Sequence, residues 1–266
     1  MERAERRVVV VGDDDRTAKL RTAIRDLGWR VGDIADANPP ADAIAAVVAV
    51  GERAVRDVLV DAPAAPVIPV GQPRFALDVA DAERCARRLF DDYDPARDDG
   101  DQPSDGLRRV THPILAVDSE GGSGSACRAA FDVALVTDEP ARISEFAVSF
   151  PEGGTESFRA DGAVVATPLG SDAYANAAGG AVVEPGGGLS VVPIAPFSTH
   201  TDAWVAADRA TLSVERETEP VSLVVDGTKR RTVAPHRAIE IEAVERVEIV
   251  VSAATASRRA RRSETL

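Results

Sequence analysis

The sequence predicts an α/β N-terminal domain followed by a β-rich C-terminal domain. Apolar strands alternate with helical patterns over the first 90 residues, whereas beyond position 130 the hydrophobic period falls to two residues. Between these regions, residues 91–106 are rich in acids, Pro and Gly and almost free of aliphatic side chains, which is typical of a linker. We therefore assign 1–106 to the α/β domain with its acidic linker, 107–251 to the β-rich domain and 252–266 to a basic C-terminal tail.

The N-terminal domain has the strand and helix pattern of a small doubly wound fold. Residues 8–12 are four valines and a glycine, and 17–27 carry apolar residues at helical spacing before Gly28 ends the helix. The same alternation continues with a strand over 45–50, a helix over 53–60, a strand over 67–70 and a helix over 81–90.

The C-terminal domain shows alternating apolar and polar residues, which predict half-buried strands. Asp226 and Gly227 stand between two such segments and predict a hairpin, because a two-residue primed turn requires positive φ. Strands are predicted over 131–135, 146–150, 163–166, 212–214, 221–225, 239–241 and 247–251.

Charge and cysteine content exclude several classes of function. The formal net charge is −13, and among the 31 basic residues only Lys19 and Lys229 are lysine. An acidic, lysine-poor surface is typical of a halophilic cytoplasm, where molar salt screens carboxylate repulsion, and it disfavours a nucleic-acid partner. Cys85 and Cys127 lack metal-binding spacing, and no apolar run approaches a membrane span, so we expect a cytoplasmic protein without a metal site or membrane contact.

Residues 159–180 carry the pattern that best suggests a ligand site. After a strand over 163–166, Gly170 lets the backbone approach a ligand and Ser171 can cap a helix over 171–178. The N-terminus of a helix offers free N–H groups to a phosphate, and Gly179 with Gly180 would end that helix. By spacing alone, a capped helix that binds no ligand is the simpler explanation.

The whole segment nevertheless resembles the signature of the NAD kinase family. In that signature, Asp-Gly and a short strand precede Thr-Pro-Thr-Gly-Ser-Thr-Ala-Tyr and then Ala-Gly-Gly. Residues 191–197 and Asp226-Gly227 are similar to later segments of the family. The positions that match the signature are Asp161, Gly162, Thr167, Pro168, Gly170, Ser171, Ala173, Tyr174, Ala178, Gly179 and Gly180.

This resemblance implies a fold, a reaction and a set of ligand contacts. The family combines an α/β nucleotide-binding domain with a β-rich NAD-binding domain, often in homo-oligomers. ATP or polyphosphate phosphorylates the adenosine ribose 2′-hydroxyl of NAD, with Mg²⁺ balancing the phosphates and an Asp taking the proton. The residues implied to hold the nucleotide, a small-molecule ligand, are Gly51, Asp161, Thr167, Gly170, Ser171, Ala173 and Tyr174.

The sequence departs from the family at the catalytic Asp. The family's Gly-Gly-Asp-Gly-Thr is replaced by Gly51-Glu52-Arg53. Glu52 is a candidate substitute base, although a displacement of about 1 Å can cost about 100-fold in rate. Alternatively, Arg53 fills the slot, or Glu52 is an exposed acid at a helix start. Asp172 is the other candidate base; it replaces a Thr and would either repel a phosphate or accept a ribose hydroxyl.

The family's Asn-Glu pair, which holds the nucleotide, is also replaced. In an ungapped alignment Val136 and Thr137 occupy its positions, and valine neither donates nor accepts a hydrogen bond. Asp138 and Glu139 compensate if the strand is shifted by one or two residues; otherwise they form a turn before Pro140.

Three functions remain open. The chain is an ATP- or polyphosphate-dependent NAD kinase, or it is an NAD(P)-binding regulatory homologue that lost phosphoryl transfer. A third function, the phosphorylation of another hydroxyl on the same scaffold, is disfavoured by the missing Gly-Gly-Asp-Gly. We expect His200 at the surface rather than in a catalytic triad.

Overall fold

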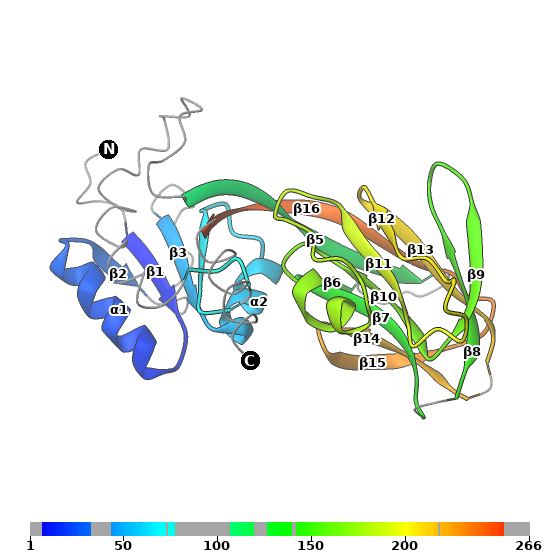
Figure 1. The fold of residues 1–266 in the computed structure, drawn as a ribbon. Coiled ribbons are helices and arrows are strands. Elements are labelled where there is room, and N and C mark those ends of the chain that lie inside the picture. The colour runs from blue at the N-terminus through cyan, green and yellow to red at the C-terminus, as the bar shows by residue number, and fades with distance from the viewer. Residues whose placement is uncertain are drawn as a thin grey trace, which may run out of the picture. The chain divides into compact units, whose positions relative to one another are not determined.

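The computed structural model describes residues 7–32, 44–72, 74–77, 107–119, 127–139, 142–217 and 219–252 (Figure 1). Two compact units comprise 1–111 with 247–266, and 112–246. The predicted helix over 81–90, the linker over 91–106 and the tail beyond Ser252 lie outside the described residues. Residues 247–252, which we assigned to the second domain, belong to the first unit because Ile249 pairs with Val67 in a parallel sheet.

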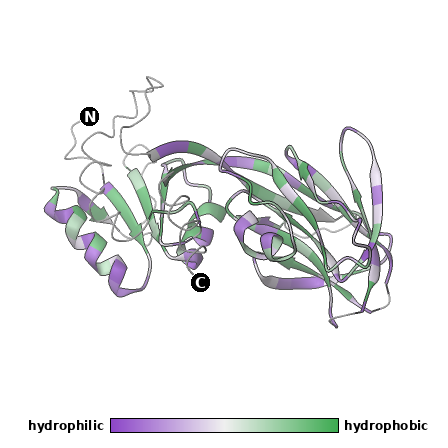
Figure 2. Cartoon of the chain, viewed as in Figure 1, coloured by the Kyte–Doolittle hydropathy of each residue, from purple (hydrophilic) through white to green (hydrophobic). Residues whose placement is uncertain are grey.

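The first unit is an α/β domain with a parallel sheet, as the alternation predicted. Its strands follow the order β2-β1-β3-β4, and the end of β16 (Ile239–Ser252) joins β4. The hydrophobic residues of β1 and β3 and of the buried face of α1 form one core, while the exposed face of α1 is hydrophilic (Figure 2). The elements of this unit are β1 (Arg7–Val11), α1 (Asp15–Asp26), β2 (Arg30–Gly32), β3 (Ile44–Val50), α2 (Glu52–Val60) and β4 (Val67–Val70).

The second unit is built from antiparallel strands in two layers. One layer is a six-stranded sheet with the order β12-β11-β10-β7-β14-β15, and the other contains β16, β13, β8 and β9, with β5 and β6 beside β16. Its elements are β5 (Leu107–Ser119), β6 (Cys127–Ala129), β7 (Asp132–Thr137), β8 (Ser144–Ser149), β9 (Thr155–Ala160), β10 (Gly162–Ala166), η3 (Ser171–Ala175), β11 (Leu189–Ile194), β12 (Trp204–Ala206), β13 (Arg209–Arg216), β14 (Val221–Val225) and β15 (Thr228–Val233).

The period of two places one face of each strand in the core between the layers. In β14, Val221, Leu223 and Val225 point into this core, whereas Val224 faces the other side. The strands predicted from alternation are therefore confirmed, except that 239–241 and 247–251 belong to a single strand, β16. The hairpin is also confirmed: Asp226 (φ 46°) and Gly227 (φ 72°) form the turn between β14 and β15.

The outer face of the six-stranded sheet is covered by the segment that carries the ligand signature. Ala175 of η3 packs on Val164 and Ala166 of β10 and on Val192 of β11. The sheet therefore supplies a rigid base for the residues that follow β10. Within the described parts of the chain, no helix has the length and apolar character of a membrane span.

Candidate functional site

The signature segment leaves β10 through a buried turn and enters a short, irregular helix. Thr167, Gly170 and Ser171 are buried, whereas Ala173 and Tyr174 are exposed. The predicted helix over 171–178 is present over 171–177 but is irregular: η3 is a π-helix of five residues, and Ala173 has non-helical φ −98° and ψ −115°. So short a helix does not supply the ordered N-terminal turn that phosphate binding uses.

Ser171 does not cap this helix, so that prediction is wrong. Gly170 is the N-cap and makes no side-chain capping bond. The Ser171 hydroxyl instead donates to the Pro168 carbonyl at 2.8 Å and accepts from the Val183 N–H at 2.8 Å. The hydroxyl satisfies two backbone groups that burial removes from water, and it ties the segment to the chain before β11.

Gly170 and Gly180 are glycines because of contacts inside the protein. A Cβ on Gly170 would lie 2.1 Å from the Phe131 carbonyl oxygen, and one on Gly180 would lie 2.4 Å from Val192 Cγ2. Gly179 ends the helix with φ +97°, as predicted. The close approach expected between Gly170 and a ligand is therefore an approach to the backbone at Phe131.

A hydrogen-bonded turn at 130–132 connects several motif residues. The Thr167 hydroxyl donates to the Ala130 carbonyl at 2.8 Å, and the Asp226 carboxylate accepts the N–H groups of Ala130, Phe131 and Asp132. Sequence reasoning assigned Thr167 to the ligand and Asp226 only to the hairpin. The bond of Thr167 spans 37 residues and those of Asp226 span 94 to 96, so nothing local in the sequence indicates them.

His112 is a further member of this cluster that the sequence did not indicate. Its Nε2 lies 2.8 Å from the Ala130 carbonyl, which can only accept, so the ring nitrogen donates. Within the described residues, the buried Nδ1 has no hydrogen-bond partner. Burial lowers the pKa of His112 to about 4, and the bond to Ala130 only partly opposes this. The imidazole is therefore neutral at physiological pH.

Tyr174 is the signature residue best placed to touch a ligand. Its side chain is 41% exposed. Burial and the negative charges of Asp132 and Asp161 raise the pKa of its phenol. Asp161 also anchors the sheet, because its carbonyl accepts the Thr137 N–H at 2.9 Å and its N–H donates to Ile194 at 2.9 Å. An aromatic face beside carboxylate acceptors can stack on a ring and bind hydroxyl groups.

The positions of the Asn-Glu pair hold no free amide or carboxylate. Val136 packs on the apolar cluster of the outer sheet face, and the Thr137 hydroxyl lies 3.1 Å from the Asp161 carbonyl. The carboxylate of Asp138 accepts from the Ser222 hydroxyl at 2.5 Å and from Lys229 at 2.9 Å, and these two bonds lower its pKa. Asp138 is thus an ionised acid whose partners, Ser222 and Lys229, belong to the protein itself.

The turn at Gly51 is open. Gly51 has φ +86°, its N–H donates to the Val70 carbonyl at 2.9 Å, and a Cβ built on it would meet nothing within 4 Å. Glu52 is exposed in the first turn of α2, where its charge favours the helix dipole. Arg53 pairs with Asp57 along the helix at 3.7 Å, so the structure shows it directed along α2.

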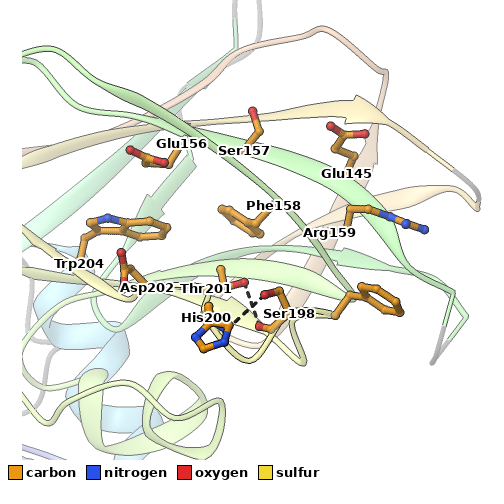
Figure 3. Close-up of a pocket in the computed structure, with 11 residues that line it drawn as sticks. Glu145, Glu156, Ser157, Phe158, Arg159, Ser198, His200, Thr201, Asp202 and Trp204 are labelled. Atoms are coloured by element: carbon orange, nitrogen blue, oxygen red, sulfur yellow. Dashed lines mark hydrogen bonds between the residues drawn. The ribbon is translucent and has the colours of Figure 1, made fainter.

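A separate cavity of about 350 Å³ lies between β9 and the loop before β12 (Figure 3). Its wall contains Trp204, whose ring lies 6.0 Å from that of Phe158, and Arg159 stacks over Phe197 at 5.2 Å. The carboxylates Glu145, Glu156 and Asp202 outnumber Arg159, so the lining disfavours a nucleotide's phosphates. His200 lies at its rim, exposed as predicted, and none of the predicted site residues lines the cavity.

The described residues contain no group of three or more His, Cys, Asp or Glu side chains placed to hold a metal ion. A magnesium ion bound to a nucleotide needs only one or two protein carboxylates beside the phosphates, and it often keeps several waters. A magnesium ion that accompanies a phosphate donor would therefore not require such a group.

The relatives of this chain agree with the signature. The profile of the ATP-NAD kinase C-terminal domain matches residues 132–253. The NAD kinase of Methanospirillum hungatei is 41% identical over 95 residues, which are 35% of this chain and 35% of that protein. The bifunctional NADP phosphatase/NAD kinase of Methanocaldococcus jannaschii is 39% identical over 100 residues, 36% of this chain and 17% of that protein. Residues 132–253 therefore form an ATP-NAD kinase C-terminal domain.

Solved structures extend this likeness over the whole fold. The ATP complex of an NAD kinase from Archaeoglobus fulgidus has a TM-score of 0.67 at 20% identity, covering 98% of this chain and 99% of that one. Yeast NADH kinase in complex with NADH has a TM-score of 0.70 at 16% identity, covering 96% and 85%. The predicted NAD kinase-like fold is confirmed. In sequence, the chain spans only about a third of the length of the first curated relatives.

The profile match also divides the predicted site residues into two groups by their position in the sequence. Its range, 132–253, contains every matching signature residue from Asp161 to Gly180 and includes Asp226. Gly51 and Glu52 lie before it. Most of the residues predicted to hold the nucleotide therefore lie in the region that matches the profile, whereas Glu52, the predicted base, lies outside that region.

Proposed function

We propose that this protein phosphorylates the adenosine ribose 2′-hydroxyl of NAD to give NADP, with ATP or polyphosphate as the donor. The observation that carries this proposal is the half-exposed Tyr174 beside Asp132 and Asp161, within the region that matches the family profile. We further propose that it works in the cytoplasm as a homo-oligomer, as the family resemblance implies.

The proposed roles follow from exposure and chemistry. Tyr174 offers a ring face for stacking, and Asp161 accepts hydrogen bonds from ribose hydroxyls. Thr167, Gly170 and Ser171 are buried, so we propose that they shape the segment and that Ala173 and Tyr174 make the outer contacts. The open turn at Gly51 allows a phosphate to approach the backbone without meeting a Cβ.

The transfer itself requires a base. Glu52, exposed at the start of α2, takes the proton of the ribose 2′-hydroxyl. The 2′-oxygen forms a bond to the terminal phosphorus of the donor, the bond from that phosphorus to its bridging oxygen breaks, and the shortened donor leaves with the electron pair. A Mg²⁺ ion bound to the donor would supply charge neutralisation for the phosphates. Asp172, half-buried in η3, is the second candidate base.

A second candidate function is NAD(P) binding without phosphoryl transfer. Val136 and Thr137 favour it, because one is apolar and the hydroxyl of the other contacts the protein's own backbone. A family member without its Asn-Glu pair and without its catalytic Asp can keep the Tyr174 face and serve as a regulatory sensor of NAD or NADP.

The deciding measurement is NADP formation from NAD at molar KCl with Mg²⁺, with ATP and polyphosphate supplied in parallel. We expect turnover that Glu52→Gln abolishes, with Asp172→Asn tested beside it. Asp61→Asn is the matched control, because it removes an exposed acid from the other end of α2. No turnover, with NAD still raising the melting temperature, would establish the binding function instead. No turnover and no stabilisation would refute both functions.

A further inference from the structure

The residues Ala130, Phe131 and Asp132, here called the β7 entry turn, are held by a side chain that lies 94 residues beyond Asp132. The Asp226 carboxylate accepts the N–H of Ala130 at 2.9 Å, of Phe131 at 2.8 Å and of Asp132 at 3.0 Å. The Asp226 N–H donates to the Asp132 carbonyl at 2.9 Å. An ionised acceptor with three backbone donors makes strong, directional bonds, so Asp226 sets where β7 begins.

The carbonyl groups of the same turn are held from other elements. Thr167 and His112 both donate to the Ala130 carbonyl, and the Thr167 N–H donates to the Phe131 carbonyl at 2.8 Å. The β7 entry turn is therefore bonded on its donor side by Asp226 and on its acceptor side by β5 and by the signature segment. A turn held on both sides has little freedom to move without breaking several buried bonds.

The third residue of this turn, Asp132, carries a carboxylate and is half-buried. Its charge acts on the Tyr174 phenol more strongly than that of Asp161, and both raise the pKa of the phenol after the larger effect of burial. Asp132 therefore lies close enough to Tyr174 to influence its electrostatics. The carboxylate joins a face whose other members, Asp161 and Tyr174, belong to the signature.

We propose that Asp226 is a positioning residue of the nucleotide-binding face: it fixes the β7 entry turn so that the Asp132 carboxylate stays beside the Tyr174 phenol. The proposal rests on the proposed function, since that function makes Tyr174 a ligand contact. It also explains why an aspartate serves here in a hairpin turn that asparagine or glycine would also fit. A neutral side chain would not offer the acceptor strength for three N–H groups.

The electrostatic part of the proposal can be measured without a nucleotide. Tyr93 and Tyr174 are the two tyrosines of the chain, so Tyr93→Phe leaves one phenol whose ionisation is followed by ultraviolet absorbance. In this background we expect Asp132→Asn to lower the pKa of Tyr174 toward its ordinary value of 10.0. The titration is done at the lowest KCl concentration that keeps the protein folded, because salt screens the effect.

Two substitutions of Asp226 separate position from charge. Asp226→Asn removes the charge, whereas Asp226→Glu keeps it on a side chain one methylene longer. We expect both to lower the pKa of Tyr174, because both displace the β7 entry turn. Thermal unfolding shows which variants are folded, and Asp226→Glu decides the test if Asp226→Asn does not fold.

The control is Asp202→Asn, which removes an acid from a loop of the same unit and should leave the pKa of Tyr174 unchanged. If Asp226→Glu is folded and also leaves it unchanged, Asp226 does not position Asp132, and the proposal is overturned. A shift with Asp226→Asn alone would have the same meaning, because charge and not position would then explain it. If Asp132→Asn leaves the pKa of Tyr174 unchanged, the side chains of Asp132 and Tyr174 are not neighbours, which also overturns the proposal.

A second readout links the position to the ligand. We expect NAD to raise the melting temperature of Asp226→Glu less than that of the unsubstituted protein. If the titration behaves as expected but NAD stabilises neither protein, the proposed function fails and the positioning role remains. If NAD stabilises both equally, Asp226 has no role in the binding face.

Discussion

The turns at Gly51 and Gly170 have the same place in their local structures, yet they differ in what surrounds them. Each follows a buried strand and begins a helical segment. At Gly51 a Cβ would meet nothing within 4 Å, whereas at Gly170 it would lie 2.1 Å from the Phe131 carbonyl oxygen. Both glycines suggest backbone approach to a ligand, but a side chain at Gly170 would collide with the protein, whereas one at Gly51 would not.

The difference shows that a signature residue can be required by the fold rather than by the ligand. Thr167, Gly170 and Ser171 satisfy or approach backbone groups of their own unit. These three residues thus have a structural reason to be in the signature, because they shape the segment that carries Tyr174. At Gly51 the only structural requirement for glycine is its φ of +86°. No packing contact explains the residue there, so a role in function would be an additional reason for glycine.

The largest effect that we expect is on stability, from Gly170→Ala. A Cβ against backbone cannot be relieved by a side-chain rotation, so the loss in the free energy of unfolding should be at least about 3 kcal/mol. Gly179→Ala is the control, because φ is +97° there and the space is open; the left-handed backbone should cost about 1–2 kcal/mol. Denaturant unfolding at high KCl measures both. Equal losses would contradict the close contact at Gly170.

A second prediction concerns His112, which holds the β7 entry turn beside Thr167. Its pKa is 6.5 when unfolded and about 4 when folded. Between these values the unfolded chain binds a proton that the folded chain does not, so stability falls as the pH falls from 6.5 to 4. The loss should approach about 3 kcal/mol, since one pKa unit is worth about 1.4 kcal/mol. Above pH 6.5 this contribution is constant.

The pH effect can be isolated with two variants. His112→Gln keeps an N–H donor near Ala130 but cannot titrate, so its stability should depend less on pH between 6.5 and 4. His200→Gln removes an exposed histidine and should retain the pH dependence of the unsubstituted protein. The comparison uses the free energy of unfolding at several pH values. An undiminished slope in His112→Gln would mean that carboxylates alone cause the acid sensitivity.

The smallest loss of stability is expected for Gly51→Ala. The position has φ +86° and ψ 158°, a region that side chains avoid, at a cost of about 1–2 kcal/mol without any steric contact. If this turn meets the phosphates, NADP formation should fall much further than the folded fraction does. Activity and unfolding are measured on the same preparation. Activity that simply follows the folded fraction would place the phosphates elsewhere.

Much of the fold was predictable because it depends on local pattern. The valine run of β1, the apolar spacing of α1 and the alternation in β14 each determine which face is buried. Asp226 and Gly227 indicated their hairpin because only a few residues accept positive φ. The capping role of Ser171 was mistaken, and the close approach of Gly170 to Phe131 was not predicted, since both depend on partners outside the local pattern: Val183 for the one and Phe131 for the other.

The sequence by itself determined the resemblance of residues 159–180 to the NAD kinase signature and the strand and helix pattern of both units. It also determined the absence of an Asp or Asn-Glu pair at the positions where that family has them. Those features depend on residue identity and spacing along the chain. Only the tertiary structure decided that Asp226, Thr167 and His112 converge on one turn, and that the charge of Asp132 acts on the Tyr174 phenol. Such hydrogen bonds and charge contacts form when strands far apart in sequence pair, and the pairing register carries information that no local pattern contains.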